Sequence, residues 1–313
     1  MSQDFLTYEE QIKKLRDEKG LTINNEAYAI DVLKHISYFA LIGGYKNIFV
    51  NPTMNKYFRD VTFEDVVLLY QFDEELRSLF MKYILKVERK LHSVLSYHFT
   101  QTYGERQEKY LDNNNYNYVP INQFEIDKLI RKLNHLANAD NHYEYINYHR
   151  TNYSNVPLWV LVNALPLGSV SKIYCFSKFS IQSKVCKDFD NLNERQLEQI
   201  LSVVTKFRNV CAHGERLFSY RTSDSIGDLL LHQKLEIPKK NSEYIYGKHD
   251  LFAVVISLRY LLPKEDFLLF KRQLIKLINC LVKDIEHLEK DDILKEMGFP
   301  SNWEKISLFR KLQ

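Results

Sequence analysis

Hydrophobic positions recur at intervals of three and four residues over most of the chain. This spacing is typical of α-helices that bury one face and expose the other. It extends furthest between residues 62 and 103, where it predicts either one long spine helix or two helices broken near Phe72-Asp73, with Gly104 at the end. Shorter periodic segments predict further helices at 7–19, 25–39, 122–137, 158–165, 169–179, 193–212, 251–262, 266–290 and 292–297.

Signals at the ends of these segments agree with a helical chain. Thr7 and Glu10 predict a capping box, and Gly20 predicts the end of the first helix. The chain has only 9 glycines and 7 prolines, which favours long helices over a sheet of many strands. Between residues 218 and 249 the pattern is poor, and no element is predicted there. The predicted fold class is therefore all-α.

Two polar stretches divide the predicted helices into three regions. The first is an Asn-rich run at 112–118, and the second is a Tyr- and His-rich connector that ends near residue 156. They predict an N-terminal helical region with the spine helix (1–111), a connector and helix (112–156) and a C-terminal helical region (157–313). The alternative is that all three form one compact unit. The Asn-rich run is either an RNA-stacking surface or, more commonly for such runs, a surface connection.

Charge and cysteine content limit the possible partners. The net charge is only +3, so any basic surface must be local. The four cysteines show no close pairing, so we expect no metal site and no disulfide framework. The sequence contains no cofactor signature, so we expect no cofactor. Reduced thiols, and no signal peptide at the first residues, predict a cytoplasmic protein. No run reaches the roughly 18 apolar residues of a membrane span, so we expect no membrane association.

The strongest candidate for chemistry is an Arg and a His near the end of one predicted helix. The run 206–216 reads Lys-Phe-Arg-Asn-Val-Cys-Ala-His-Gly-Glu-Arg and contains Arg208 and His213. At about 100° per residue, Asn209 and His213 share a polar face. Arg208 lies at the border with the apolar face, where a charged residue must snorkel, pair or meet a partner surface. Gly214 is expected to end the helix and to leave His213 at its carboxyl end, where the helix dipole favours a protonated imidazole.

These two residue types are sufficient to cut RNA without a metal. A base takes the proton of the 2′-hydroxyl, an acid protonates the leaving 5′-oxygen, and a cation stabilises the crowded phosphate. Histidine can do the first two, and the planar fork of arginine matches phosphate oxygens. Arg208 and His213 are about 140° apart on an ideal helix, so two copies across a two-fold axis bring an Arg and a His together more easily than one copy does. The Arg-x4-His spacing is weak by itself, because chance produces it in many chains.

The residues around this pair resemble a family signature. Residues 208–218 are similar to the RN-x3-H-x-E-R signature of the Abi (abortive infection) family, AbiD/AbiF type, which carries a HEPN-type ribonuclease domain. Further segments resemble other blocks of this family in the same order: 20–23 with 36–45, 87–91, 156–160 and 167–171. The resemblance runs from about residue 8 to 220 and leaves the role of residues 220–313 open.

The resemblance implies a HEPN-like helical bundle with additional helices at both ends, and a bacterial anti-phage role. It implies a metal-independent endoribonuclease with His213 as general acid–base, Arg208 as phosphate-stabilising cation and Asn209 as orienting residue. Active HEPN nucleases usually pair two Arg–His motifs, and this chain has one good motif, so the resemblance implies a homodimer. Residues 89–92 are a possible degenerate second motif with a short spacing. The implied partners are substrate RNA and a small structured non-coding RNA.

Other basic residues are weaker candidates for RNA binding. These are Lys206, Arg216, Arg89 and Lys90. Glu88, with the two basic residues that follow it, is either a supporting cluster near the catalytic helix or a solvated run of charge. Lysines at positions 172, 178, 184 and 187 either track phosphates or, because acidic residues interrupt them, are scattered over the surface.

Two other functions remain open at this point. One is an RNA-binding protein that holds a small structured RNA without cutting it. The other is a helical interaction protein in which Arg208 and His213 are interface residues. RNA cleavage in EDTA is expected only of the metal-independent nuclease and not of these two alternatives.

Overall fold

Helices make up nearly all of the regular structure. The computed structural model describes residues 5–189, 191–286 and 288–309, so the first four residues, on which the expectation about a signal peptide rests, lie outside it. In the described part, the strands form two short antiparallel pairs: β1 (Val50–Asn51) with β2 (Lys56–Tyr57), and β3 (Lys239–Lys240) with β4 (Glu243–Tyr244). The predicted all-α class is confirmed. None of the described helices is both long enough and apolar enough to cross a membrane.

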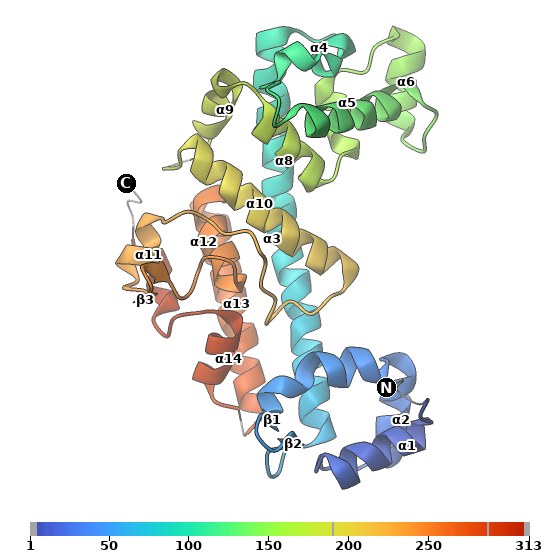
Figure 1. The fold of residues 1–313 in the computed structure, drawn as a ribbon, viewed down its shortest axis with the longest axis vertical. Coiled ribbons are helices and arrows are strands. Elements are labelled where there is room, and N and C mark those ends of the chain that lie inside the picture. Colours follow the sequence, from blue (N-terminus) through green and yellow to red (C-terminus); the bar gives the residue numbers. More distant parts are fainter. Residues whose placement is uncertain (1–4, 190, 287, 310–313) are drawn as a thin grey trace.

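One helix of 41 residues, α3 (Phe63–Tyr103), runs through the length of the molecule (Figure 1). Thr62 caps its first turn through a capping box with Asp65, and Gly104 ends it with a φ of 101°. The helix is not broken at Phe72-Asp73, so the single spine helix is the correct alternative. Both of these residues are buried, because α3 has other helices packed along it.

The remaining elements form three groups around α3 (Figure 1). At its first turns lie α1 (Tyr8–Lys13), η1 (Lys14–Glu18), α2 (Glu26–His35), η2 (Phe39–Gly43), η3 (Lys46–Phe49) and the β1–β2 pair. At its far end lie α4 (Gln107–Leu111), η4 (Asn113–Asn115), α5 (Gln123–Asn138), α6 (Glu144–Tyr153), α7 (Leu158–Leu161), η5 (Val162–Ala164), α8 (Leu167–Phe176) and α9 (Phe179–Cys186). Along its middle lie α10 (Glu194–His213), α11 (Leu230–Lys234), the β3–β4 pair, α12 (Leu251–Leu261), α13 (Lys264–Asp284), α14 (Lys290–Met297) and η6 (Trp303–Ser307).

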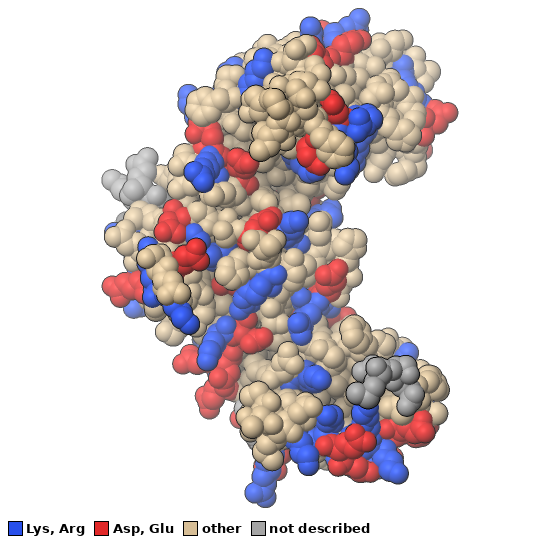
Figure 2. Space-filling model, in the orientation of Figure 1, with Lys and Arg blue, Asp and Glu red and all other residues tan. Residues whose placement is uncertain are grey.

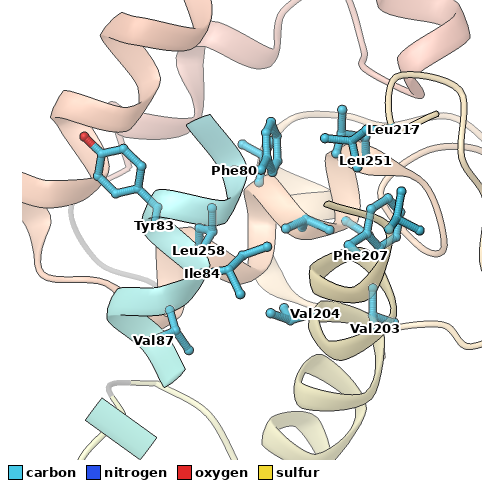
Figure 3. Packing of buried hydrophobic residues seen from close by; sticks show 14 of the residues in the cluster. Phe80, Tyr83, Ile84, Val87, Val203, Val204, Phe207, Leu217, Leu251 and Leu258 are labelled. Carbon is cyan, nitrogen blue, oxygen red and sulfur yellow. The ribbon is translucent and has the colours of Figure 1, made fainter. Parts of the chain in front are cut away.

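The core forms where α10, α12 and α13 pack on α3. Figure 3 shows buried apolar side chains from three of these helices: Phe80, Ile84 and Val87 of α3, Val203, Val204 and Phe207 of α10, and Leu251 and Leu258 of α12. Ten of the eleven residues of α12 are buried, as expected of a helix that is apolar all round. The region after residue 220 therefore completes the core against which the Arg–His helix packs.

Several helix boundaries differ from the predictions. The Tyr- and His-rich connector forms α6, which buries only Ile146 and so lacks a clear apolar period. The segment predicted as 169–179 ends at Phe176 and a new helix begins at Phe179, while the predicted helix 266–290 ends at Asp284. Between residues 218 and 249 the chain forms α11 and the β3–β4 pair.

One tyrosine of the Asn-rich run is part of the core and not of the surface. Tyr116 is 1% exposed, and its hydroxyl donates to the carbonyl oxygen of Tyr110 at 2.8 Å. Its backbone forms a bridge with Ser177. This ring is therefore not available for stacking on RNA bases.

Candidate functional site

The Arg–His run lies on α10, and both ends of this helix are where the sequence predicts them. Asn193 caps the first turn through a capping box with Gln196. Gly214 ends the helix in the left-handed region, with a φ of 68°, and leaves His213 as the last helical residue. Of the predicted apolar face, five residues are buried and Cys211 is half-buried; the buried residues are Leu197, Ile200, Leu201, Val204 and Phe207.

Arg208 pairs with a buried carboxylate of the spine helix. Its Nε lies 3.5 Å from Oε2 of Glu88, which is 6% exposed. Of the three roles open to a charged residue at this border, the structure therefore shows pairing. Oε1 of Glu88 also lies 3.9 Å from Nε2 of His92, one turn further along α3. Glu88 thus lies between Arg208 and His92, and it is not part of a solvated run.

The three atoms at the centre of this cluster are buried without a hydrogen-bond partner among the described residues: Oε2 of Glu88, Nε of Arg208 and Nε2 of His92. Buried polar atoms are normally paired, because desolvation without a hydrogen bond is costly. A charged cluster with unused hydrogen-bonding capacity next to a helix face is typical of functional sites.

Asn209 and His213 lie on the exposed side of α10, as the helical phase predicts. Among the described residues, no hydrogen bond or ion pair joins His213 to Arg208. The two members of the motif are therefore accessible to different degrees: Arg208 is held against α3, and His213 faces solvent.

The residues that follow His213 are fixed by a second buried carboxylate of α3. Asp73, which is 0% exposed, accepts the backbone N–H groups of Leu217 at 2.9 Å and Phe218 at 2.7 Å. It also accepts the Tyr45 hydroxyl and an Arg77 N–H, each at 2.7 Å. Four donors on one carboxylate fix the end of the motif to the start of the spine helix.

The four weaker RNA-binding candidates lie in different surroundings. Arg216 donates to the carbonyl oxygen of Gly44, so it contacts the N-terminal region. Lys90 lies over the Phe189 ring at 4.3 Å from its centroid, whereas Lys206 is exposed on α10. Arg89 is exposed and lines a cavity of about 750 Å³ together with His92, Tyr97 and Trp159. RNA binding by these residues stays a prediction.

His92 is a buried histidine whose pKa is lowered by burial to about 4. The unfolded chain binds this proton near the ordinary value of about 6.5, so protonation favours unfolding. We expect its contribution to stability to be complete above pH 6.5 and to be lost as pH falls to about 4.

This pH effect can be measured with a variant that does not titrate. We expect His92→Gln to flatten the fall in unfolding free energy between pH 6.5 and 4.5, measured by urea denaturation. The difference in slope should approach about 1.4 kcal/mol per pH unit, the linkage value for one proton. His35→Gln, at the exposed end of α2, is the matched control and should keep the wild-type slope. Equal slopes for wild type and His92→Gln would contradict the assignment.

The sequence predicted α10 and its polar residues but not the roles of Asp73, Arg77 and Tyr45. Asp73 and Arg77 are charged residues at four-residue spacing within an apolar stretch, which is the signal that points to a buried pair. No group of three or more His, Cys, Asp or Glu in the described ranges is placed to hold a metal ion.

The segment that contains this site matches a known protein family. The family model described as Abi-like protein matches residues 31–219, more than half of the chain, and the match includes both Glu88 and the Arg208–His213 run. Neither the curated proteins nor the solved structures gave a match. The chain therefore belongs to the Abi-like protein family.

Proposed function

We propose that this protein is a metal-independent endoribonuclease of the HEPN type, which acts as a homodimer in the abortive-infection defence of bacteria against phage. Membership of the Abi-like family supports the defence role. The Arg-x4-His run on α10 supports the chemistry, because it combines a phosphate-binding cation with a proton-transfer group on one helix.

The observation that carries the proposal is that Arg208 is paired within the subunit whereas His213 is exposed. The Arg208 guanidinium lies beside the buried Glu88 carboxylate, which keeps it close to α3, while His213 is exposed at the end of its helix. A catalytic cation must be pre-oriented to stabilise a transition state, whereas a proton-transfer group must reach the substrate. The arrangement meets both needs.

The proposed reaction uses the 2′-hydroxyl of the RNA as nucleophile. His213 takes the proton of the 2′-hydroxyl, and the 2′-oxygen forms a bond to phosphorus. The bond between phosphorus and the 5′-oxygen breaks, and this oxygen receives a proton from His213 of a second copy. Arg208 stabilises the charge on the phosphate oxygens, and Asn209 orients the phosphate. The products are a 2′,3′-cyclic phosphate and a 5′-hydroxyl.

A second copy supplies what one subunit lacks. His213 and Arg208 are five residues apart, which puts them about 140° apart around a regular helix. A two-fold axis near the end of α10 lets the histidine of each copy approach the arginine of the other. The proposed active site therefore requires a homodimer.

One observation favours a second candidate function. The pairing of Arg208 with Glu88 satisfies its charge within the subunit and leaves His213 apart from it. This is also what we expect of an RNA-binding protein that holds a small structured RNA without cutting it. Purification with one discrete RNA, without cleavage of any RNA offered, would support this alternative.

A cleavage assay in EDTA tests the main proposal. We expect the protein to cut RNA with excess EDTA present and to leave 2′,3′-cyclic phosphate ends, identified by mass spectrometry. RNA with 2′-O-methyl groups should stay intact, because it has no 2′-hydroxyl to attack. Cleavage that requires added Mg²⁺, or that leaves 5′-phosphate ends, would contradict the proposal.

A further inference from the structure

A second cavity lies on the polar side of α10, next to Asn209. It has a volume of about 690 Å³, and its walls come from α5, α8 and α10, with Asp224 from the segment that follows α10. Gly168 is part of the wall, and a Cβ at this position would lie 3.1 Å from Cγ2 of Thr205, so a glycine lets α8 approach α10 closely. The cavity is therefore built by the packing of three helices.

Four lysines from these three helices converge on the cavity: Lys128 and Lys132 of α5, Lys172 of α8 and Lys206 of α10. Two carboxylates also line it, and each accepts a hydrogen bond from a neighbour. Glu198 accepts from Sγ of Cys175 at 3.0 Å, and Asp224 accepts from Oγ of Ser202 at 2.6 Å. The lining therefore has an excess of positive charge.

Two of the four lysines already bind neighbouring side chains, and two do not. Lys172 pairs with Glu125 at 2.6 Å, and Lys132 donates to Oγ of Ser169 at 2.7 Å. Burial, and then the charge of Lys172, lower the pKa of Lys132, which agrees with positive charges held close together. Lys128 and Lys206 make no hydrogen bond or ion pair within the described ranges, so their ammonium groups are available to an anion.

Hydroxyl groups add neutral donors to this charge. Ser169 and Ser171 line the cavity and are buried, at 7% and 8% exposure. Oγ of Ser169 accepts from Lys132 and keeps its own proton to donate. Oγ1 of Thr205 is buried without a hydrogen-bond partner among the described residues. Ammonium and hydroxyl donors in one pocket form a set that matches phosphate oxygens.

The cavity lies on the path to the motif. Lys206, Asn209 and His213 follow one another along the same side of α10, and the first two line the cavity. Figure 2 shows Lys and Arg side chains, with a few acidic ones, over the α5, α8 and α10 part of this face. The cavity and His213 therefore lie along the same side of α10.

We propose that this cavity binds the phosphate backbone of single-stranded RNA beside the Arg208–His213 site, with Lys128 and Lys206 as the main contacts. A space of about 690 Å³ takes one or two nucleotides, and a double helix cannot enter it. The inference rests on the proposed function for the role of the bound RNA as substrate. Binding itself does not depend on cleavage.

The test measures RNA binding without cleavage. The probe is a fluorescein-labelled single-stranded RNA of ten nucleotides with 2′-O-methyl groups, and the readout is anisotropy at several salt concentrations. We expect Lys128→Ala/Lys206→Ala to weaken binding at least tenfold at low salt. The slope of log affinity against log salt should fall by about 1.4, since each phosphate contact contributes roughly 0.7 for single strands.

A matched variant controls for net charge. Lys34→Ala/Lys276→Ala removes two exposed lysines, one on α2 and one on α13, and we expect it to bind like wild type. Equal losses in both variants, equal binding of a duplex of the same length, or no binding by wild type would each overturn the proposal.

Two further outcomes separate the cavity from the nuclease function. If Lys128→Ala/Lys206→Ala loses affinity while wild type cuts no RNA, binding at the cavity is supported and the nuclease function fails. If wild type cuts RNA and the loss of both lysines changes neither binding nor cleavage, the nuclease function is supported and the cavity proposal is overturned.

Discussion

Replacing His213 or Arg208 with alanine is expected to reduce RNA cleavage by about 10²–10⁴-fold. General acid–base catalysis and the stabilisation of phosphate charge each contribute on this scale. Because the pair is proposed to act as one unit, the double variant should lose little more than either single variant. The measurement is the initial rate of cleavage of a labelled RNA in EDTA.

Controls separate lost chemistry from lost structure. His213 is exposed, so His213→Ala should unfold at the wild-type temperature. His35→Ala, also a histidine at the exposed carboxyl end of a helix, should cut RNA at the wild-type rate. Arg208→Lys keeps the charge but loses the fork and should remain impaired. Full activity in both Arg208→Ala and His213→Ala would remove the basis of the proposed function.

Replacing Asp73 with alanine is expected to lower the unfolding free energy by about 3–5 kcal/mol, the usual cost of breaking a buried ion pair from one side. The change leaves the Arg77 guanidinium buried without its main partner. It also leaves the N–H groups of Leu217 and Phe218 without an acceptor. The measurement is urea denaturation at pH 7.

Two variants calibrate this result. Asp31→Ala removes an exposed aspartate of α2 and should change the unfolding free energy by less than about 0.5 kcal/mol. Tyr45→Phe removes one of the four donors to Asp73 and should cost about 1 kcal/mol. A loss for Asp73→Ala no larger than that for Asp31→Ala would show that the carboxylate does not hold this junction.

The sequence was sufficient to predict the helix that carries the motif. Its two end signals, Asn193 and Gly214, act within a few residues, and its buried face follows from a local period. The border position of Arg208 predicted that it must find a partner. The partner itself, Glu88, could only be suspected, because the contact joins residues far apart in the chain.

Other parts of the site depend entirely on long-range packing. The sequence places Lys172 near Lys178 and Lys184, which follow it in the chain. In the structure, Lys172 converges instead with Lys128 and Lys132 of α5. No local period encodes which helix packs against which, so this cavity could not be predicted. The contact between Asp73 and Leu217 joins residues 144 apart in the sequence, so it too could not be predicted from a local pattern.

The late position of α12 and α13 in the chain has a consequence for protein synthesis. A chain that has been translated as far as residue 218 already contains the whole motif, but it lacks the two helices that complete the core of α3 and α10. The part of α3 on which α12 and α13 pack is then uncovered. Under the proposed function, the nuclease becomes competent only after α12 and α13 have been synthesised.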